Sequence, residues 1–256
     1  MGLILAAVLP AMMGQTLSLD TEALGRLLDG RGNLWRDAGF RHGLLGPSSP
    51  GLPVRHAAGP DAQSPAYVYI AQTLRGDAAS QAPWIRRALI CLKAGACLSF
   101  DQVRSYGAAV RPVLELRQAK GFEVLAPRAH RVRRLDDRLL VEPTAQETEQ
   151  TIATLVFPRA SARPDTGMVE SLEFVGARVA EWVALFHLDS RSAGGAASFE
   201  VKGAGTLRFV ITGLAGGTWE IWHNGFLTDS QGGVEKSSGV LYFEGKPGGY
   251  FLRRIG

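Results

Sequence analysis

Cysteine and histidine are scarce in this sequence. Its 256 residues contain two cysteines, Cys91 and Cys97, and five histidines. Two cysteines are too few for a small scaffold held by several disulfides or for a zinc site with four cysteine ligands. The sequence therefore predicts no bound metal and no other cofactor, and the fold has to come from a hydrophobic core.

Long apolar runs are also missing. The most apolar segment, Met1–Met13, is shorter than the about 20 residues that a membrane-spanning helix needs, so no span is predicted. Two interpretations of residues 1–26 stay open. A signal peptide would make the protein periplasmic or secreted, although no Lys or Arg precedes the apolar residues. A remnant helix from a longer ancestral protein would leave the protein cytoplasmic.

The charge is only mildly unbalanced. A formal net charge of +4 is compatible with an acidic partner such as a uronate polysaccharide, but an ordinary basic surface is the simpler interpretation. The 31 Gly and 13 Pro are spread along the chain, as turn residues are between many short strands. The composition therefore favours one mainly β domain over residues 27–256.

Residue patterns along the chain agree with a β fold. Thr21–Asp29 has an N-cap and leucines at helical spacing, which predicts one short N-terminal helix. Val175–Phe186 fits a helix as well, but we expect a strand from Glu181 because valine and aromatic residues suit buried strands. The other expected strands are Ala66–Leu74, Trp84–Leu92, Ala96–Val103, Arg111–Arg117, His130–Leu135, Arg138–Glu142, Thr151–Phe157, Glu181–Leu188, Ser198–Lys202, Leu207–Thr212, Thr218–His223, Val240–Glu244 and Tyr250–Arg254.

The segment Pro83–Ser105, PWIRRALICLKAGACLSFDQVRS, predicts a β-hairpin. A turn at Lys93–Gly95 would place Cys91 directly opposite Cys97. A disulfide is then conceivable if the protein is exported. We favour the alternative, in which both cysteines are small buried side chains of the core.

The order of these features resembles the β-sandwich part of the heparinase II/III-like polysaccharide lyases. The resemblance rests on LLDGRGN, SPAYVYIAQTLRGDA, the arginine-bearing hairpin and PVLELRQAKGFEVLAP, followed near the C-terminus by GLAGGTWEIWHNG and GVLYFEGKPGGYFLRRI. It extends over Leu27–Ile255 and implies an antiparallel β-sandwich of the super-sandwich type. In that family, the enzymes cleave uronate-containing polysaccharides by β-elimination.

The sequence departs from the family pattern where catalysis is concerned. The resemblance would place the catalytic Tyr and the substrate-positioning Asn and His in an α/α toroid that is not recognisable in this sequence, and no His precedes Leu27. Elimination needs a base and groups that neutralise the substrate carboxylate. We therefore expect a lyase-related sandwich module without a complete catalytic set. The alternative is a non-catalytic carbohydrate-binding or structural module that partners a separate toroid or self-associates.

Two kinds of candidate site residue remain. His42, His56 and His130 are candidate bases, although surface histidines are the simpler interpretation. Arg131, Arg133 and Arg134 could bind uronate carboxylates, or they could only protect an edge strand. Without interleaved aromatic residues they do not predict nucleic-acid binding. The substrate-binding candidates also include Trp219 and Trp222, of which at least one is expected in the core.

Overall fold

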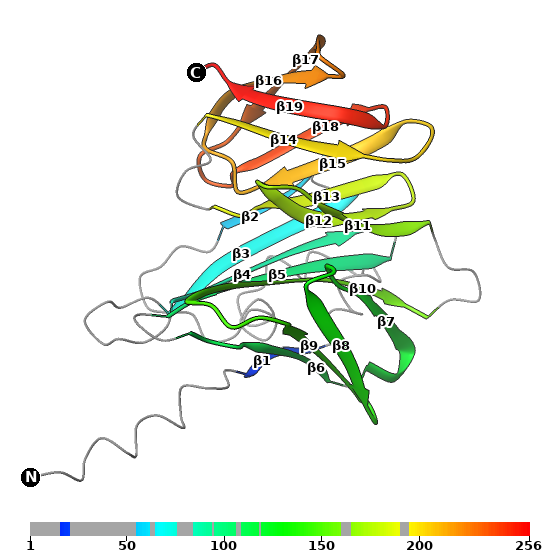
Figure 1. The fold of residues 1–256 in the computed structure, drawn as a ribbon. Coiled ribbons are helices and arrows are strands. Elements are labelled where there is room, and N and C mark those ends of the chain that lie inside the picture. The colour runs from blue at the N-terminus through cyan, green and yellow to red at the C-terminus, as the bar shows by residue number, and fades with distance from the viewer. Residues whose placement is uncertain are drawn as a thin grey trace, which may run out of the picture.

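The chain folds into four stacked β-sheets (Figure 1). The computed structural model describes residues 16–20, 55–61, 65–75, 84–93, 95–105, 109–117, 119–159, 165–189 and 195–256. We number the sheets 1 to 4 from the bottom of Figure 1 to the top. The expected helix at Thr21–Asp29 and the segment 1–15 lie outside the described residues. Within the described part, no helix is long and apolar enough to cross a membrane.

Sheets 1 and 2 form the lower half of the stack. In spatial order, sheet 1 consists of β1 (Thr16–Asp20), β6 (Val113–Arg117), β9 (Arg138–Pro143) and β8 (His130–Leu135). Sheet 2 consists of β2 (Arg55–Gly59), β3 (Tyr67–Arg75), β4 (Trp84–Leu92), β5 (Ala96–Arg104), β10 (Glu149–Pro158) and β7 (Phe122–Leu125). A 3-10 turn, Ala119–Gly121, precedes β7.

Sheets 3 and 4 form the upper half. Sheet 3 consists of β11 (Thr166–Glu170), β12 (Phe174–Val179), β13 (Trp182–His187), β15 (Leu207–Thr212) and β18 (Val240–Gly245). Sheet 4 consists of β14 (Ala196–Val201), β19 (Gly248–Arg254), β16 (Gly217–His223) and β17 (Phe226–Val234). Pairing is antiparallel except between β1 and β6 and between β13 and β15, so the predicted mainly antiparallel, sandwich-like class is confirmed.

Three hydrophobic cores separate the four sheets. We call them the lower core (sheets 1 and 2), the middle core (sheets 2 and 3) and the upper core (sheets 3 and 4). Sheets 2 and 3 are covered on both faces, so every residue of β13 is buried. The outer sheets have one free face, and the sequence of β14 therefore alternates between exposed and buried residues.

The helical alternative for Val175–Phe186 is wrong. The segment forms the hairpin β12–β13, in which Ala180 takes a positive φ of 53° at the turn. Val175 and Val179 enter the middle core, while Phe174 enters the upper core, which is the period-two alternation of a strand between two cores.

Candidate functional site

The basic strand β8 lies at the edge of sheet 1, where all of its residues except His130 are exposed. Arg131 and Arg133 lie opposite Glu142 and Leu140 of β9, on the side that faces away from the lower core. Arg133 pairs with Glu142 at 3.1 Å. Arg134 points to the other side and donates to the carbonyl oxygen of Phe122 at 3.0 Å. The structure thus separates Arg134 from the other two predicted arginines.

Two arginines that sequence reasoning missed extend this basic surface. Arg117 on β6 and Arg138 on β9 both bind the carboxylate of Glu115, at 3.3 Å and 3.1 Å. The hydrogen bond from Arg138 lowers the pKa of Glu115, burial opposes this, and Arg117 lowers the pKa further. In the sequence, the alternation of Glu115 and Arg117 in β6 was the one feature that could have indicated that these two side chains share a face of the sheet.

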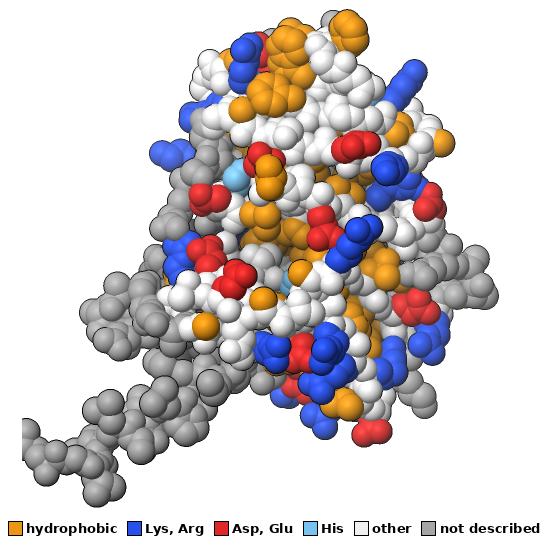
Figure 2. Space-filling view, in the orientation of Figure 1, with side chains coloured by type: hydrophobic (Ala, Val, Ile, Leu, Met, Phe, Trp, Pro, Cys, Tyr) orange, Lys and Arg blue, Asp and Glu red, His pale blue; other side chains and the backbone are white. Residues whose placement is uncertain are grey.

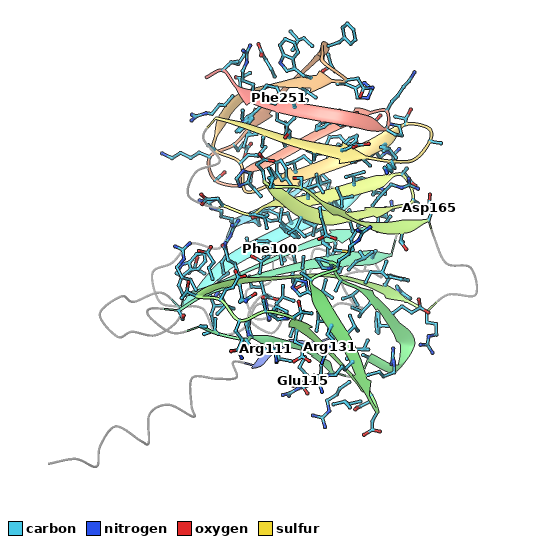
Figure 3. All side chains as sticks on the ribbon, viewed as in Figure 1. Phe100, Arg111, Glu115, Arg131, Asp165 and Phe251 are labelled. Atoms are coloured by element: carbon cyan, nitrogen blue, oxygen red, sulfur yellow. A yellow bond between two sulfur atoms is a disulfide. The ribbon has the colours of Figure 1, made fainter. Side chains whose placement is uncertain are left out.

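We call the outward residues Arg117, Arg131, Arg133 and Arg138 the arginine face. They outnumber the two carboxylates among them, Glu115 and Glu142, and Arg131 has no ion pair within the described part of the chain. Figure 2 shows basic side chains gathered at the lower end of the molecule, and Figure 3 places Arg131 and Glu115 on its lowest layer. Four guanidinium groups on one sheet face provide fork-shaped donors for carboxylate or sulfate oxygens.

His130 is half-buried where β8 begins. Its Nε2 lies 2.8 Å from the carbonyl oxygen of Thr151, so Nε2 carries the proton in the neutral ring. Nδ1 is then an acceptor, and it has no partner among the described residues. His130 lines a small apolar cavity of about 170 Å³ together with Glu170. Burial lowers the pKa of His130, so the ring is a neutral acceptor at pH 7, but Nδ1 is hidden from the surface.

The other predicted histidines do not join His130. His56 is exposed on β2, at the edge of sheet 2, whereas His130 lies between sheets 1, 2 and 3. His42 lies outside the described residues. In the part of the chain that the structure describes, no three His, Cys, Asp or Glu side chains are grouped as a metal site would require.

The two tryptophans of β16 face opposite sides of sheet 4. Trp219 is 1% exposed, and its indole Nε1 donates to the carbonyl oxygen of Ala215 at 2.9 Å inside the upper core. This corrects its place among the candidates, because a ligand cannot reach it. Trp222 is half-buried on the outer face, where the Arg253 guanidinium lies 5.7 Å from its ring centre. Of these two tryptophans, Trp222 is the one available for contact with a sugar ring.

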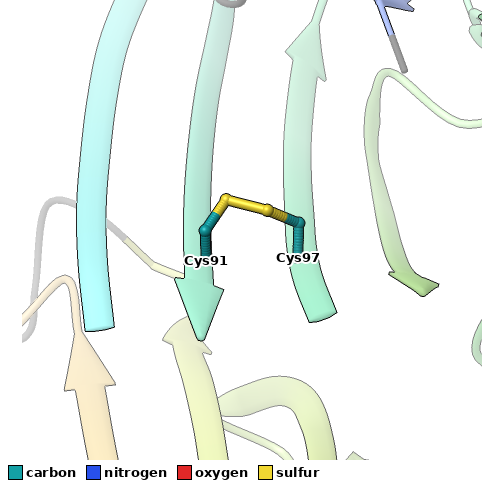
Figure 4. Close-up of a disulfide and its surroundings, with 2 residues drawn as sticks. All are labelled: Cys91 and Cys97. Carbon is teal, nitrogen blue, oxygen red and sulfur yellow. A yellow bond between two sulfur atoms is a disulfide. The ribbon is translucent and has the colours of Figure 1, made fainter. Parts of the chain in front are cut away.

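The hairpin β4–β5 carries a disulfide and a buried ion pair. Cys91 and Cys97 are register partners and are bonded to each other (Figure 4). Our preference for two reduced core cysteines is therefore wrong, because the short turn holds the two Cα atoms 4.1 Å apart. Further along, Arg87 Nε lies 2.6 Å from Asp101 Oδ1, with Asp101 fully buried in the sheet.

A groove lies beside the edge strands β11 and β14. Its volume is about 780 Å³, and it is lined by basic and acidic side chains in similar number. Arg178 in this groove binds Asp165 and the carbonyl oxygen of Lys202. The groove therefore has no excess of positive charge, whereas the arginines of the arginine face outnumber the carboxylates among them.

Residues 168–254 match the family model of the heparinase II C-terminal domain. The match covers most of β11 and all of β12–β19, which are the strands of sheets 3 and 4. The chain thus carries a heparinase-like C-terminal domain. No curated protein matches the chain.

Two solved lyase structures are similar to parts of the chain. The heparan sulfate lyase HepC from Pedobacter heparinus shares 9% identity over 48% of this chain and 25% of its own, with a TM-score of 0.32. The chondroitin AC lyase of Streptomyces coelicolor A3, solved in complex with chondroitin sulphate, shares 12% identity over 74% of this chain and 35% of its own, with a TM-score of 0.25. This chain therefore spans well under two thirds of either enzyme.

Proposed function

We propose that this chain is a β-sheet module of a polysaccharide lyase-related protein, and that it binds acidic polysaccharide without cleaving it. Two observations support this. The upper half of the chain matches a heparinase C-terminal domain. The lower half presents the arginine face, where four guanidinium groups surround two carboxylates.

The arginine face suits a polyanion better than a single small acid. The Arg133 side chain is 49% exposed, whereas that of its partner Glu142 is 12% exposed. An incoming carboxylate or sulfate can therefore bind the exposed edge of the guanidinium without displacing Glu142. Attraction between exposed charges is screened within about 10 Å at 0.1 M salt. Binding through this face should therefore weaken steeply as the salt concentration rises.

Cleavage would need a base beside the carboxylate-binding groups. The arginine face has none, because Glu115 and Glu142 are held by arginines and the acceptor atom of His130 is hidden. We infer that a catalytic set, where one operates, comes from a separate toroid domain. Purified chain should therefore produce no rise in ultraviolet absorbance from the conjugated double bond of a lyase product with heparin, heparan sulfate or alginate. A clear rise would overturn the non-catalytic assignment.

Polysaccharide binding can be tested with a pair of matched variants. We expect Arg131→Ala/Arg133→Ala to weaken heparin binding by about tenfold at low salt and to flatten its salt dependence. Arg208→Ala is the control, because Arg208 is as exposed as Arg133 and also ion-paired, but lies on sheet 3. Equal binding by wild type and the double variant would refute the role of the arginine face.

A second candidate function is association through the outer face of sheet 4. Phe251 is 42% exposed there and Leu227 is 48% exposed, and both lie beside Trp222 in the register, Phe251 on β19 and Leu227 on β17. Figure 3 shows Phe251 on the uppermost layer. Clustered exposed aromatic residues favour association. Sedimentation would distinguish the two candidates, because a strictly monomeric chain at high concentration argues against this one.

A further inference from the structure

Three arginines on the hairpin β4–β5 differ in how they are paired. Arg87 binds Asp101 at 2.6 Å, and Arg104 Nε binds Glu149 at 2.8 Å. Arg86 is only 7% exposed, yet within the described part of the chain it has no ion pair and no hydrogen bond from its side chain. The most buried unpaired charge of the hairpin is therefore Arg86.

Arg86 faces sheet 3, at one end of the middle core. Its guanidinium carbon lies 5.8 Å from the ring centre of Phe100. Gln102 is its register partner on β5 and is buried as well. The Gln102 amide donates to Glu149 at 2.8 Å and to the carbonyl oxygen of Leu188 at 2.9 Å. These two bonds hold the Gln102 side chain in place beside Arg86.

A buried donor and a buried acceptor are left over at this point. Arg86 Nη1 and Gln102 Oε1 both lack a hydrogen-bond partner among the described residues. A guanidinium stays charged at every physiological pH, so the site cannot relieve the cost by losing a proton. The Phe100 ring offsets only a part of the cost of burying this charge. An anion would offset more, because a carboxylate or a sulfate accepts two parallel N–H bonds from one guanidinium.

The residues just outside Arg86 suit a sugar that carries the anion. Trp84 and Arg104 are register partners in the next row toward the end of the sheet. The Arg104 guanidinium lies 5.9 Å from the ring centre of Trp84, and both side chains are partly exposed. An amphipathic ring beside fixed charges is a common contact surface for polar rings.

The positive charge of Arg86 also acts on His187 of the neighbouring sheet 3. Burial lowers the pKa of His187, and the charge of Arg86 lowers it further.

We propose that Arg86 is the anchor of a second anion site, between sheets 2 and 3, which takes the carboxylate or sulfate group of an acidic sugar. The sugar part of this inference rests on the proposed function, whereas the binding of an anion does not. The Arg86 guanidinium donates to the bound group, and Trp84 and Arg104 contact the ring that carries it. Gln102 does not bind the anion, because both of its amide hydrogens are donated to Glu149 and to the carbonyl oxygen of Leu188. The arginine face lies on sheet 1, so the two sites are separate.

Thermal unfolding in the presence of ligand tests the site. The probes are inorganic sulfate, glucuronate and, as a neutral control, glucose. At ten times the dissociation constant, an anion that binds the folded state should raise the Tm of wild type by about 3 °C. The Arg86→Met variant should show no such rise. If the ligand also fails to raise the Tm of Arg86→Lys, the paired N–H donors of the guanidinium are needed, and not only its positive charge.

Unliganded variants show whether the substitution itself damages the fold. Arg86→Met removes an unpaired buried charge, so its Tm without ligand should equal or exceed that of wild type. Should Arg86→Met fail to fold, Arg86→Lys carries the test. A wild-type Tm that neither sulfate nor glucuronate raises, or a rise that Arg86→Met retains, would overturn the proposal.

Two further measurements distinguish a sugar ligand from a free anion, and test the Arg86 site independently of the proposed function. A greater rise with glucuronate than with sulfate at equal ionic strength supports a sugar ligand, and equal rises support binding of the anion alone. The measurement is repeated on Arg131→Ala/Arg133→Ala, which lacks the main residues of the arginine face. The Arg86-dependent rise should persist there. Its disappearance in that background would place the anion on sheet 1 and refute a second site.

Discussion

The two ends of the stack are built from different side chains. The buried hydrophobic residues of the lower core include no aromatic ring, and the disulfide Cys91–Cys97 and the pair Arg87–Asp101 lie on the same face of sheet 2. The upper core is an aromatic network without a buried ion pair among the described residues. Its aromatic members are Phe174, Phe199, Phe209, Trp219, Phe243 and Tyr250.

The outer surfaces differ in the same way. Sheet 1 presents the arginine face, whereas sheet 4 presents Trp222, Leu227 and Phe251. Each outer sheet has one free face, so the fold alone does not decide what that face carries. The comparison teaches that the lower core adds a disulfide and a buried ion pair to its apolar contacts, and that the sheet below it carries the face that we propose binds a polyanion. The upper end is held by ring packing and is suited to an apolar partner.

Breaking the ion pair of the lower core should have the largest effect. Arg87→Met leaves the Asp101 carboxylate charged and fully buried, with Ser99 as its remaining side-chain donor at 3.1 Å. We expect the free energy of unfolding to fall by about 3 to 5 kcal/mol, measured by urea unfolding. Arg87→Met/Asp101→Leu should recover most of this loss. A double variant as unstable as Arg87→Met would show that the charge of Asp101 is not the cause.

Removing a ring from the upper core should cost a similar amount for a different reason. Phe209 is fully buried, with ring centres 4.6 Å from Phe243 and 4.8 Å from Tyr250. Phe209→Ala leaves a cavity, and we expect a loss of about 3 to 5 kcal/mol. No removal of a partner should rescue this loss, so Phe209→Ala/Phe243→Ala should be less stable than either single variant. Recovery in the double variant would contradict the contrast between the two cores.

Reducing the disulfide should have a smaller effect. The bond closes a loop with a sequence separation of 6, and loops of that length contribute about 2 kcal/mol in the chain-entropy account. Thermal unfolding with and without reductant measures it. Cys91→Ala/Cys97→Ala is the control, because its Tm should not respond to reductant. A wild-type Tm that is also unaffected would show that the cysteines contribute only by packing.

Much of the lower half was predictable from local pattern. The expected strands Trp84–Leu92 and His130–Leu135 agree with β4 and β8, and the turn at Lys93–Gly95 correctly predicted that Cys91 faces Cys97. The disulfide itself was not predictable, because the proximity of two thiols does not determine whether they are oxidised. The strands β1, β2, β7 and β11 were missed, since four or five residues at a sheet edge carry little periodicity. The longer strands β12 and β17 were missed as well.

The candidate site was less predictable. An alternating strand shows that Trp219 and Trp222 face opposite sides, but not which side is covered, because that depends on sheet 3. Arg138 and Glu115 are separated by 23 residues and meet only through the pairing of β6 with β9. Arg86 looks like Arg87 in sequence. Only the register shows that one of them faces a carboxylate.

The smallest expected effect is a pH dependence that both ends share. Burial lowers the pKa of His130, next to sheet 1, and of His187, whose ring lies 5.1 Å from Phe174 in the upper core. A lowered folded-state pKa means that the neutral ring is favoured in the folded protein. The stabilising contribution of each buried histidine is therefore complete above the unfolded-state pKa of about 6.5. It is lost as the pH falls through the pKa of the histidine in the folded state.

We therefore expect the free energy of unfolding to decrease between pH 7 and pH 5, measured by urea unfolding at fixed ionic strength. His130→Gln and His187→Gln should each make this decrease shallower, whatever they cost at pH 7. His56→Gln is the matched control for the substitution itself, because His56 is exposed on β2. If only His187→Gln changes the slope, the half-buried His130 is solvated more than its position suggests. A slope that neither variant changes would show that carboxylates, and not these rings, set the acid sensitivity of both ends.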